Sequence, residues 1–180
     1  MELPDAEQYS ATEVLPDGLP VRIRAIRPDD KARLLEHFNR LSAQARRYRF
    51  FAGKRSLTER ELKRLTELDF INHVGLALTT DADGSEQFVG VARYLRAADP
   101  ARAEIALAVR DDYQGRGIGP LLIHHLARIA RANGIQMFEA NVLGDNDRML
   151  KVIRRSGCAV KTVTDAGIVH IDLCCPSLPQ

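Results

Sequence analysis

The sequence predicts one mixed α/β domain, of the α+β kind, with a mostly antiparallel sheet. Strand-like segments alternate with amphipathic helical ones, a glycine-rich turn joins one strand to the longest helix, and no repeat or low-complexity linker divides the chain. With 180 residues, of which 45% are hydrophobic and 28% charged, the chain has the size and composition of one compact domain. We therefore expect one domain over residues 19–180, preceded by a tail or hairpin arm over residues 1–18.

The first part of the chain is expected to begin with a hairpin. Apolar and basic residues alternate over 21–26 after the turn signal Pro16-Asp17-Gly18. Asp29 or Asp30 is expected to cap the next helix, and Thr58 the last of three helices. The expected elements are a strand at 21–26, a helix from 28 to 40, two short helices within 42–68, and strands at 73–80, 88–96 and 102–109.

The second part of the chain holds the longest expected helix, at 117–133. Its apolar residues form one continuous face, and Asn133-Gly134 is a typical helix stop. The remaining expected elements are a strand at 136–143, a helix at 146–156, and a terminal hairpin of 160–163 with 168–173.

Charge and composition exclude several classes of protein. Lys and Arg number 26 and Asp and Glu 24, and the resulting charge of +2 is too small for a dedicated nucleic-acid binder. No apolar run is long enough to cross a membrane, and residues 1–18 lack the apolar core of a secretory signal. Cys158, Cys174 and Cys175 have neither disulfide nor zinc-ligand spacing, so we expect reduced thiols, no metal and a cytoplasmic location.

The motif with chemical content is Gln114-Gly115-Arg116-Gly117-Ile118-Gly119, between an expected strand and the longest helix. Its alternating glycines let backbone N–H groups converge, and the helix start adds unpaired N–H groups and the positive end of the dipole, so the turn suits a pyrophosphate. The motif is neither a P-loop nor a G-x-G-x-x-G dinucleotide fingerprint. Taken alone, three glycines are also compatible with a plain flexible connection.

With this loop the sequence resembles the GNAT superfamily of acyl-CoA-dependent N-acyltransferases, whose phosphate loop reads Gln/Arg-x-x-Gly-x-Gly/Ala. It resembles more closely the catalytic domain of bacterial Pat-type protein lysine acetyltransferases, through five further segments. They are Ile26-Arg27-Pro28-Asp29-Asp30, Arg47-Tyr48-Arg49-Phe50-Phe51, Gly90-Val91-Ala92-Arg93-Tyr94, Ala103-Glu104-Ile105-Ala106 and Asn146-Asp147-Arg148-Met149-Leu150. The resemblance implies a GNAT-like central sheet flanked by helices on both faces, with strands splayed apart at the cofactor site.

The resemblance also implies acetyl-CoA as the acyl donor and indicates the residues that hold it. The pantetheine arm is expected along one strand, as an added strand would lie. The implied cofactor residues are Leu107, Ala108, Val109, Gln114, Gly115, Arg116, Gly117, Ile118, Gly119, Asn141, Asn146 and Met149. The alternatives are ordinary sheet pairing for the strand and a helix N-cap as the whole role of Asn146.

Glu104 is the candidate general base. A lysine ammonium, with a pKa of about 10.4, must lose a proton before its nitrogen can attack a thioester, so a nearby carboxylate is needed. Glu104 stands in an otherwise apolar strand just before the loop, and the resemblance places the base of Pat-type enzymes there. The alternative is a structural carboxylate paired with Arg93 or Arg102.

Other candidate residues have weaker roles. Many superfamily members carry a Tyr seven residues after the Asn, where this chain has Ile153, so the general acid is unassigned. Tyr113 is expected to be a packing residue, and His73 either a proton-path or a structural histidine. The basic run at 46–55 is expected to form a solvated or substrate-facing rim, because the nearly neutral background argues against RNA.

The predicted function is acetyl transfer from acetyl-CoA to an amine by direct attack, with Glu104 as base. The resemblance implies a protein lysine as acceptor, such as one in an acyl-CoA synthetase, and the basic rim would suit an acidic surface around that lysine. A small-molecule amine is the second interpretation, and a non-catalytic acyl-CoA-sensing module is the third. No nucleic-acid or membrane partner is expected.

Overall fold

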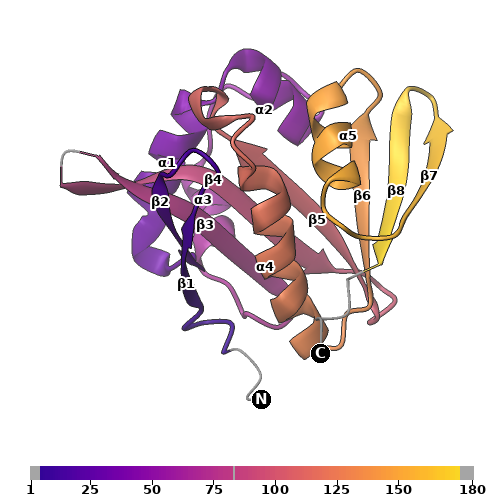
Figure 1. Cartoon of the computed structure of the whole chain (residues 1–180), viewed down its shortest axis with the longest axis horizontal. Coiled ribbons are helices and arrows are strands. Elements are labelled where there is room, and N and C mark those ends of the chain that lie inside the picture. The colour runs from indigo at the N-terminus through magenta and orange to yellow at the C-terminus, as the bar shows by residue number, and fades with distance from the viewer. Residues whose placement is uncertain (1–4, 83, 175–180) are drawn as a thin grey trace.

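An eight-stranded sheet with the order β1-β2-β3-β4-β5-β6-β8-β7 is the frame of the molecule (Figure 1). The computed structural model describes residues 5–82 and 84–174. Every neighbouring pair of strands runs antiparallel except β5 and β6, which run parallel. The strands are β1 (Ser10–Val14), β2 (Pro20–Ala25), β3 (His73–Ala82), β4 (Ser85–Arg96), β5 (Arg102–Val109), β6 (Met137–Leu143), β7 (Val160–Asp165) and β8 (Ile168–Cys174). The predicted mixed, mostly antiparallel sheet is confirmed, and β1 and β2 form the expected hairpin.

Over the described residues, five α-helices accompany the sheet, close to the expected positions. They are α1 (Lys31–Arg40), α2 (Ala43–Phe50), α3 (Glu59–Thr66), α4 (Ile118–Ala132) and α5 (Asp147–Arg154), with short 3-10 turns η1 (Pro28–Asp30) and η2 (Asp111–Tyr113). Local sequence explains two of the starts. The hydroxyl of Ser42 accepts the N–H of Ala45 at 3.1 Å, and Thr58 with Glu61 forms a reciprocal capping box at α3.

The cap expected from Asp29 or Asp30 lies at the start of η1, where Asp30 accepts the Arg27 N–H, and not at the start of α1. Asp30 occupies the N-cap position of α1, but its side chain accepts no backbone N–H of that helix and binds only the Arg33 side chain there, at 3.1 Å. The side chain is fully buried, and its carboxylate lies 2.7 Å from the guanidinium of Arg24 and accepts the N–H of Arg27 at 2.8 Å. A buried carboxylate is stable only when it is paired, so the ion pair with the strand takes precedence over the cap.

Helices cover both faces of the sheet, as predicted. In Figure 1, α4 crosses the near face over β3 to β5, and α1 to α3 lie on the opposite face. Gly90 of β4 lets α4 approach closely, because a Cβ there would lie 2.9 Å from Cγ2 of Ile118 and 3.0 Å from Cδ1 of Leu122. The sheet therefore has one apolar core under α4 and a second, smaller one under α1 and α3.

Two further expectations concern the cysteines and the membrane. Cys158 and Cys174 are free thiols, whereas Cys175 lies outside the described residues. None of the helices in the described ranges is both long enough and apolar enough to span a bilayer.

Candidate active site

The parallel strands β5 and β6 diverge soon after they begin. Their pairing joins residues 102–104 to residues 137–139. Beyond this point, as far as the described residues go, β5 pairs only with β4 and β6 only with β8. The splay expected from the resemblance is therefore present, and Leu107, Ala108 and Val109 lie along the open edge of β5.

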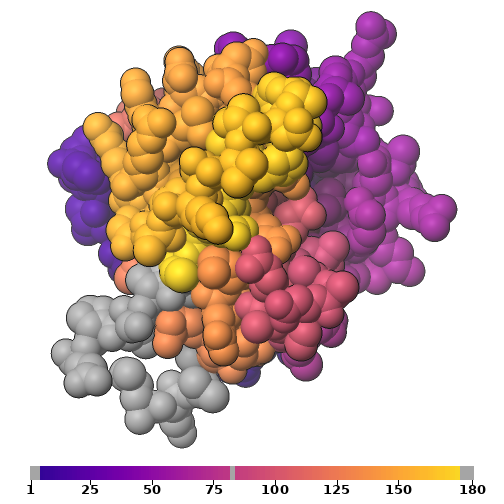
Figure 2. Space-filling view, turned by 90° about the vertical axis from the view of Figure 1, so that its right-hand side faces the viewer, coloured from indigo at the N-terminus to yellow at the C-terminus, as the bar shows by residue number. Residues whose placement is uncertain are grey.

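A cavity of about 60 Å³ opens between the diverging strands. Five of the residues expected at the cofactor or the reaction line it, namely Glu104, Leu107, Asn141, Asn146 and Met149. Its other walls come from α2, α5 and the middle of both strands. Figure 2 looks onto this side of the molecule, where the orange and yellow segments of β6 to β8 stand on one side and the purple helical segment on the other.

The glycine-rich loop leads from β5 to the start of α4, and two of its glycines have a backbone conformation that other residues rarely adopt. Gly115 and Gly117 have φ angles of +79° and +86°, in the left-handed region that glycine adopts without strain. Among the described residues no side chain caps α4. Because Pro120 has no N–H, the first turn offers the N–H groups of Ile118 and Gly119, together with the positive end of the helix dipole.

Side chains of the loop bind protein groups rather than the space in front of the helix. The amide nitrogen of Gln114 donates to the Val109 carbonyl at 3.0 Å, and its amide oxygen accepts from Arg148 of α5. Arg116 forms an ion pair with Asp17 of the β1–β2 turn at 3.3 Å. The loop is thus tied to β5, α5 and the N-terminal hairpin, while its backbone is left to meet a ligand.

Glu104 occupies the last paired position before the strands separate, opposite Leu95 of β4 and Glu139 of β6. Its side chain is exposed and lines the cavity. Within the described part of the chain it forms no ion pair and no side-chain hydrogen bond. Its negative charge acts on Arg49 of α2. Burial lowers the pKa of Arg49 and the Glu104 carboxylate raises it, so that the pKa is about 10.

The two arginines named as structural partners for Glu104 have other partners. Arg102 binds Glu139 and also Asp172, the latter with 2.7 Å between Nη2 and Oδ1. Arg93 donates to the Leu65 carbonyl at 3.3 Å. Neither arginine thus forms the ion pair with Glu104 that the structural alternative named, and the carboxylate lies exposed where the two strands separate.

The start of α5 forms the far wall of the cavity. Asn146 is 7% exposed, and its side-chain oxygen accepts the Met149 N–H at 3.1 Å, so the predicted N-cap is confirmed. Asn141 of β6 forms a 2.6 Å hydrogen bond with Nδ1 of His170. Ile153 is 2% exposed and lines the same cavity, so α5 presents an apolar side chain where many superfamily members present a tyrosine.

Comparison with known proteins identifies the family. A model of the acetyltransferase (GNAT) family matches residues 39–158. The chain belongs to the GNAT acetyltransferase family. Its membership makes it an enzyme of the N-acetyltransferase class and confirms the resemblance found in the sequence.

Several GNAT relatives match over most of the chain. An acetyltransferase of Pseudomonas aeruginosa is 33% identical over 72% of this chain and 70% of its own length. Acetyltransferase Pat of Mycolicibacterium smegmatis is 35% identical over 95% of this chain and 52% of its own, so the GNAT chain spans about half of that relative. The solved GNAT domain of S. lividans PAT superposes with a TM-score of 0.84 and 35% identity, over 95% of this chain and 98% of that domain.

Sequence reasoning missed the contribution of α2 to this GNAT site. Tyr48, Arg49 and Phe51 line the cavity, although the basic run that holds them was expected to be a rim. Tyr48 donates to the Asp145 carbonyl at 3.1 Å, and Arg47 forms an ion pair with the Asp145 side chain at 2.9 Å. The alternation of basic and aromatic residues was the available signal in the sequence. Only the tertiary contacts with the β6–α5 turn show that this face of α2 lies against the cavity.

The contacts of His73 and Tyr113 bear on the roles expected of these two residues. His73 accepts from Arg93 at 3.3 Å between Nε2 and Nη1, and burial with the Arg93 charge lowers its pKa to about 4. Its imidazole is therefore neutral, with Arg93 as its hydrogen-bond donor, as a structural histidine would be. Tyr113 packs against the core under α4 and stacks with Arg110 and Arg116, as a packing residue should.

Proposed function

We propose that this GNAT chain transfers an acetyl group from acetyl-CoA to the side-chain amine of a protein lysine. The observation that carries the proposal is the position of Glu104 at the point where β5 and β6 separate, as an exposed carboxylate with no ion pair and no side-chain hydrogen bond among the described residues. A catalytic base has to be free to exchange protons with a substrate, whereas a structural carboxylate is held by cations.

The open edge and the loop suit the parts of acetyl-CoA. The backbone along the open edge of β5, from Leu107 to Val109, would pair with the pantetheine amides, except for the Val109 carbonyl, which already accepts from Gln114. The N–H groups at the start of α4 would bind the pyrophosphate between Gln114 and Gly119. Asn141, Asn146 and Met149 would hold the arm from the side of β6 and α5. When bound, acetyl-CoA supplies an acetyl group activated as a thioester. A GNAT structure from Salmonella typhimurium with acetyl-CoA shares this fold, with a TM-score of 0.70 and 18% identity.

Glu104 would take a proton from the acceptor ammonium, through a water molecule. This step is needed because the ammonium, with a pKa of about 10.4, has no lone pair for attack at pH 7. The neutral amine then attacks the thioester carbon directly, the C–N bond forms, the nitrogen releases its second proton to water, and the C–S bond breaks. The apolar side chain of Ile153 leaves α5 without a hydroxyl at this point, so water is left to supply the proton to the departing sulfur.

A protein lysine is the acceptor we favour. The Pat resemblance implies it, and acyl-CoA synthetases are a suitable class of acceptor. The surroundings of Glu104 support a macromolecular acceptor, because Phe51 and Leu95 beside it are 44% and 54% exposed. Exposed apolar side chains around a reacting group suit contact with another protein surface. The alternatives are a small amine as acceptor, or an acyl-CoA-binding module without turnover.

Titration calorimetry with acetyl-CoA, followed by thiol release in the presence of a panel of lysine-bearing proteins, tests the proposal. We expect acetyl-CoA binding and thiol release that depends on the acceptor, with acetyl-lysine found by mass spectrometry. Release with small amines alone would favour the second interpretation, and tight binding without release would favour the sensing module. Absence of binding would contradict the assignment of the loop and the open edge.

A further inference from the structure

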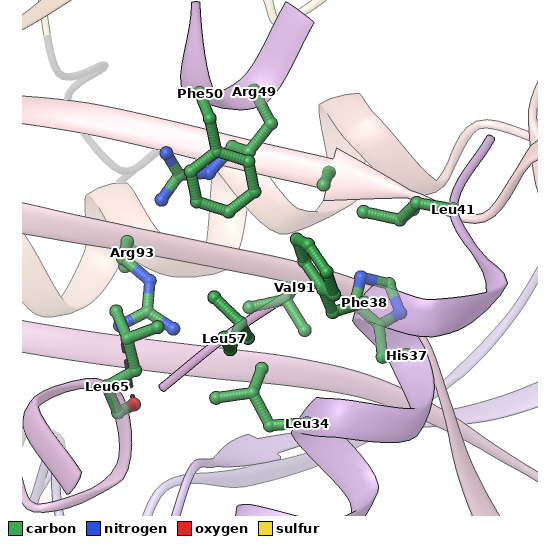
Figure 3. Close-up of a pocket in the computed structure, with 11 residues that line it drawn as sticks. Leu34, His37, Phe38, Leu41, Arg49, Phe50, Leu57, Leu65, Val91 and Arg93 are labelled. Atoms are coloured by element: carbon green, nitrogen blue, oxygen red, sulfur yellow. Dashed lines mark hydrogen bonds between the residues drawn. The ribbon is translucent and has the colours of Figure 1, made fainter. Parts of the chain in front are cut away.

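A second cavity, of about 30 Å³, lies on the same side of the sheet as Glu104, between α1, α2, β4 and β5 (Figure 3). Its wall is formed largely by leucine and phenylalanine side chains. The polar exceptions are the imidazole of His37 from α1, whose buried Nε2 has no hydrogen-bond partner among the described residues, and two guanidinium groups. These belong to Arg49 of α2 and Arg93 of β4, which Figure 3 shows on one side of the cavity. Such groups need a counter-charge where water is scarce.

Neither arginine finds a carboxylate partner within the described ranges. Arg93 is 8% exposed and donates only to neutral acceptors, the Leu65 carbonyl and His73. Arg49 stacks on Phe50, with 4.9 Å from its guanidinium carbon to the ring centroid. Burial and the neighbouring positive charges lower the pKa of Arg93 to about 9. The cavity thus holds two positive charges that an anion would stabilise.

Elsewhere the same chain pairs a buried arginine with acids. Arg24 is 4% exposed, and its guanidinium lies 2.7 Å from Asp30 and 2.7 Å from Glu86. This pairing is the usual condition for burying a charged side chain. Glu104 acts on Arg49 electrostatically, but within the described residues no carboxylate forms an ion pair with Arg49 or Arg93, so a ligand carboxylate would be their first close counter-charge.

The register of the sheet connects this cavity to Glu104. Arg93 lies opposite Ala106 and Leu95 lies opposite Glu104, so Arg93 and Glu104 are diagonal neighbours on one face of the β4–β5 pair. Such positions are about 7–8 Å apart. Arg49 lines both the splay cavity and the second cavity, so the two spaces adjoin at its guanidinium.

The size of the cavity limits what the arginines can hold. A water-sized group needs about 10–15 Å³ measured in this way, so the cavity accommodates two or three heavy atoms. A carboxylate has three, and its two oxygens match the fork of a guanidinium. We propose that Arg49 and Arg93 form a subsite for a carboxylate of the acceptor, next to the position of the amine that is acetylated. This inference rests on the proposed acetyl transfer with Glu104 as base.

The carboxylate can come from two sources, which substrate pairs distinguish. One pair is a capped lysine peptide with Glu beside the lysine and its Gln counterpart, and the other is free lysine and lysine amide. Hydrogen bonds to charged groups contribute about 1.5–3 kcal/mol, so we expect kcat/KM to be about 10- to 100-fold higher for the carboxylate member of one pair. A peptide preference indicates an acidic residue beside the acceptor lysine, and a lysine preference indicates a free amino acid.

Charge-removing variants locate the subsite. In Arg49→Gln and Arg93→Gln the preference should fall to within about twofold, whereas Arg60→Gln, the same change on the exposed surface of α3, should keep it. If Arg93→Gln does not fold, because Leu65 and His73 lose their donor, Arg49→Gln carries the test alone. Equal kcat/KM within both substrate pairs, or a preference that survives in Arg49→Gln, would overturn the assignment.

A binding measurement separates failure of the subsite from failure of the proposed function. Sodium acetate, titrated into the wild-type protein at constant ionic strength against sodium chloride, should shift the Nε–H resonances of Arg49 and Arg93 to saturation. Saturable shifts without turnover on any lysine substrate would reject the proposed acetyl transfer and retain the carboxylate subsite. Shifts equal in acetate and chloride would reject the subsite whatever the turnover.

Discussion

The contact between Gly119 of α4 and Val152 of α5 sets how closely two elements of the site approach. A Cβ added at Gly119 would lie 2.7 Å from Cγ1 and 2.9 Å from Cγ2 of Val152, well inside the usual separation of about 3.5–4.0 Å between carbon atoms. Gly119 is helical and is absent from the positions with positive φ. Gly119→Ala therefore tests helix packing without adding backbone strain.

The expected cost follows from two opposed effects. Overpacking costs about 1–3 kcal/mol, and alanine in place of glycine within a helix recovers about 0.5–1 kcal/mol. We expect a net loss of about 1–2 kcal/mol in the free energy of unfolding, with Tm lower by about 2–4 °C for each kcal/mol. With Val152→Ala both Cγ atoms are gone and the nearest atom left at that residue is its Cβ, at 3.4 Å. In that background Gly119→Ala should be neutral, or stabilising by up to about 1 kcal/mol.

Urea unfolding of the wild type, both single variants and the double variant measures this coupling. We expect a coupling free energy of about 1–3 kcal/mol, and acetyl-CoA affinity that is weakened in Gly119→Ala and recovers in the double variant. The same loss of stability from Gly119→Ala in both backgrounds would refute the idea that Val152 is the obstacle.

Three further predictions concern acid stability, the buried ion pair and α2. Burial lowers the pKa of His37 from 6.5 to about 4. As the pH falls, the imidazole is therefore protonated in the unfolded chain before it is protonated in the folded one. The free energy of unfolding measured in urea should therefore fall as the pH drops from 6.5 toward 4, by up to about 1.4 kcal/mol per pH unit, and less in His37→Gln; equal slopes would contradict this. Arg24→Ala leaves the fully buried Asp30 without its main partner and should lower the free energy of unfolding by about 3–5 kcal/mol in thermal melts, whereas a loss below about 1 kcal/mol would contradict the role of the pair. Arg47→Ala breaks an ion pair with Asp145, in which the two side chains are 49% and 58% exposed, so the free energy of unfolding should change by less than about 1 kcal/mol. The KM for the acceptor should rise, because α2 is held less firmly against the β6–α5 turn. An unchanged KM would argue against α2 as part of the site.

Elements with local signals could be predicted from the sequence. The apolar face of α4 and the Asn133-Gly134 stop locate the longest helix to within a residue at each end. Asn146 is found as the N-cap of α5, since the short polar side chain and the helical pattern after it are adjacent in the sequence. The family loop likewise lies within six consecutive residues, which makes it recognisable without the fold.

Features that depend on distant segments could not be predicted. The partners of Arg102, Glu139 and Asp172, are 37 and 70 residues away, and they leave Glu104 free because β6 and β8 bring two other acids to this edge. The sequence places Arg93 in a strand, but only the packing of α2 over β5 sets Arg49 beside the same cavity. Register and helix docking therefore decide which charged residues serve structure and which are left for a ligand.

The most direct test of the central claim compares Glu104→Gln with the wild type in turnover and in acetyl-CoA affinity. Glu36→Gln is the matched control, because Glu36 is an exposed acid on α1 that forms a 2.8 Å ion pair with Arg40. We expect turnover in Glu104→Gln to fall by about 10²- to 10⁴-fold, as for loss of a general base, with acetyl-CoA affinity unchanged within about twofold. Turnover of Glu104→Gln equal to that of Glu36→Gln would contradict the assignment of Glu104 as the base.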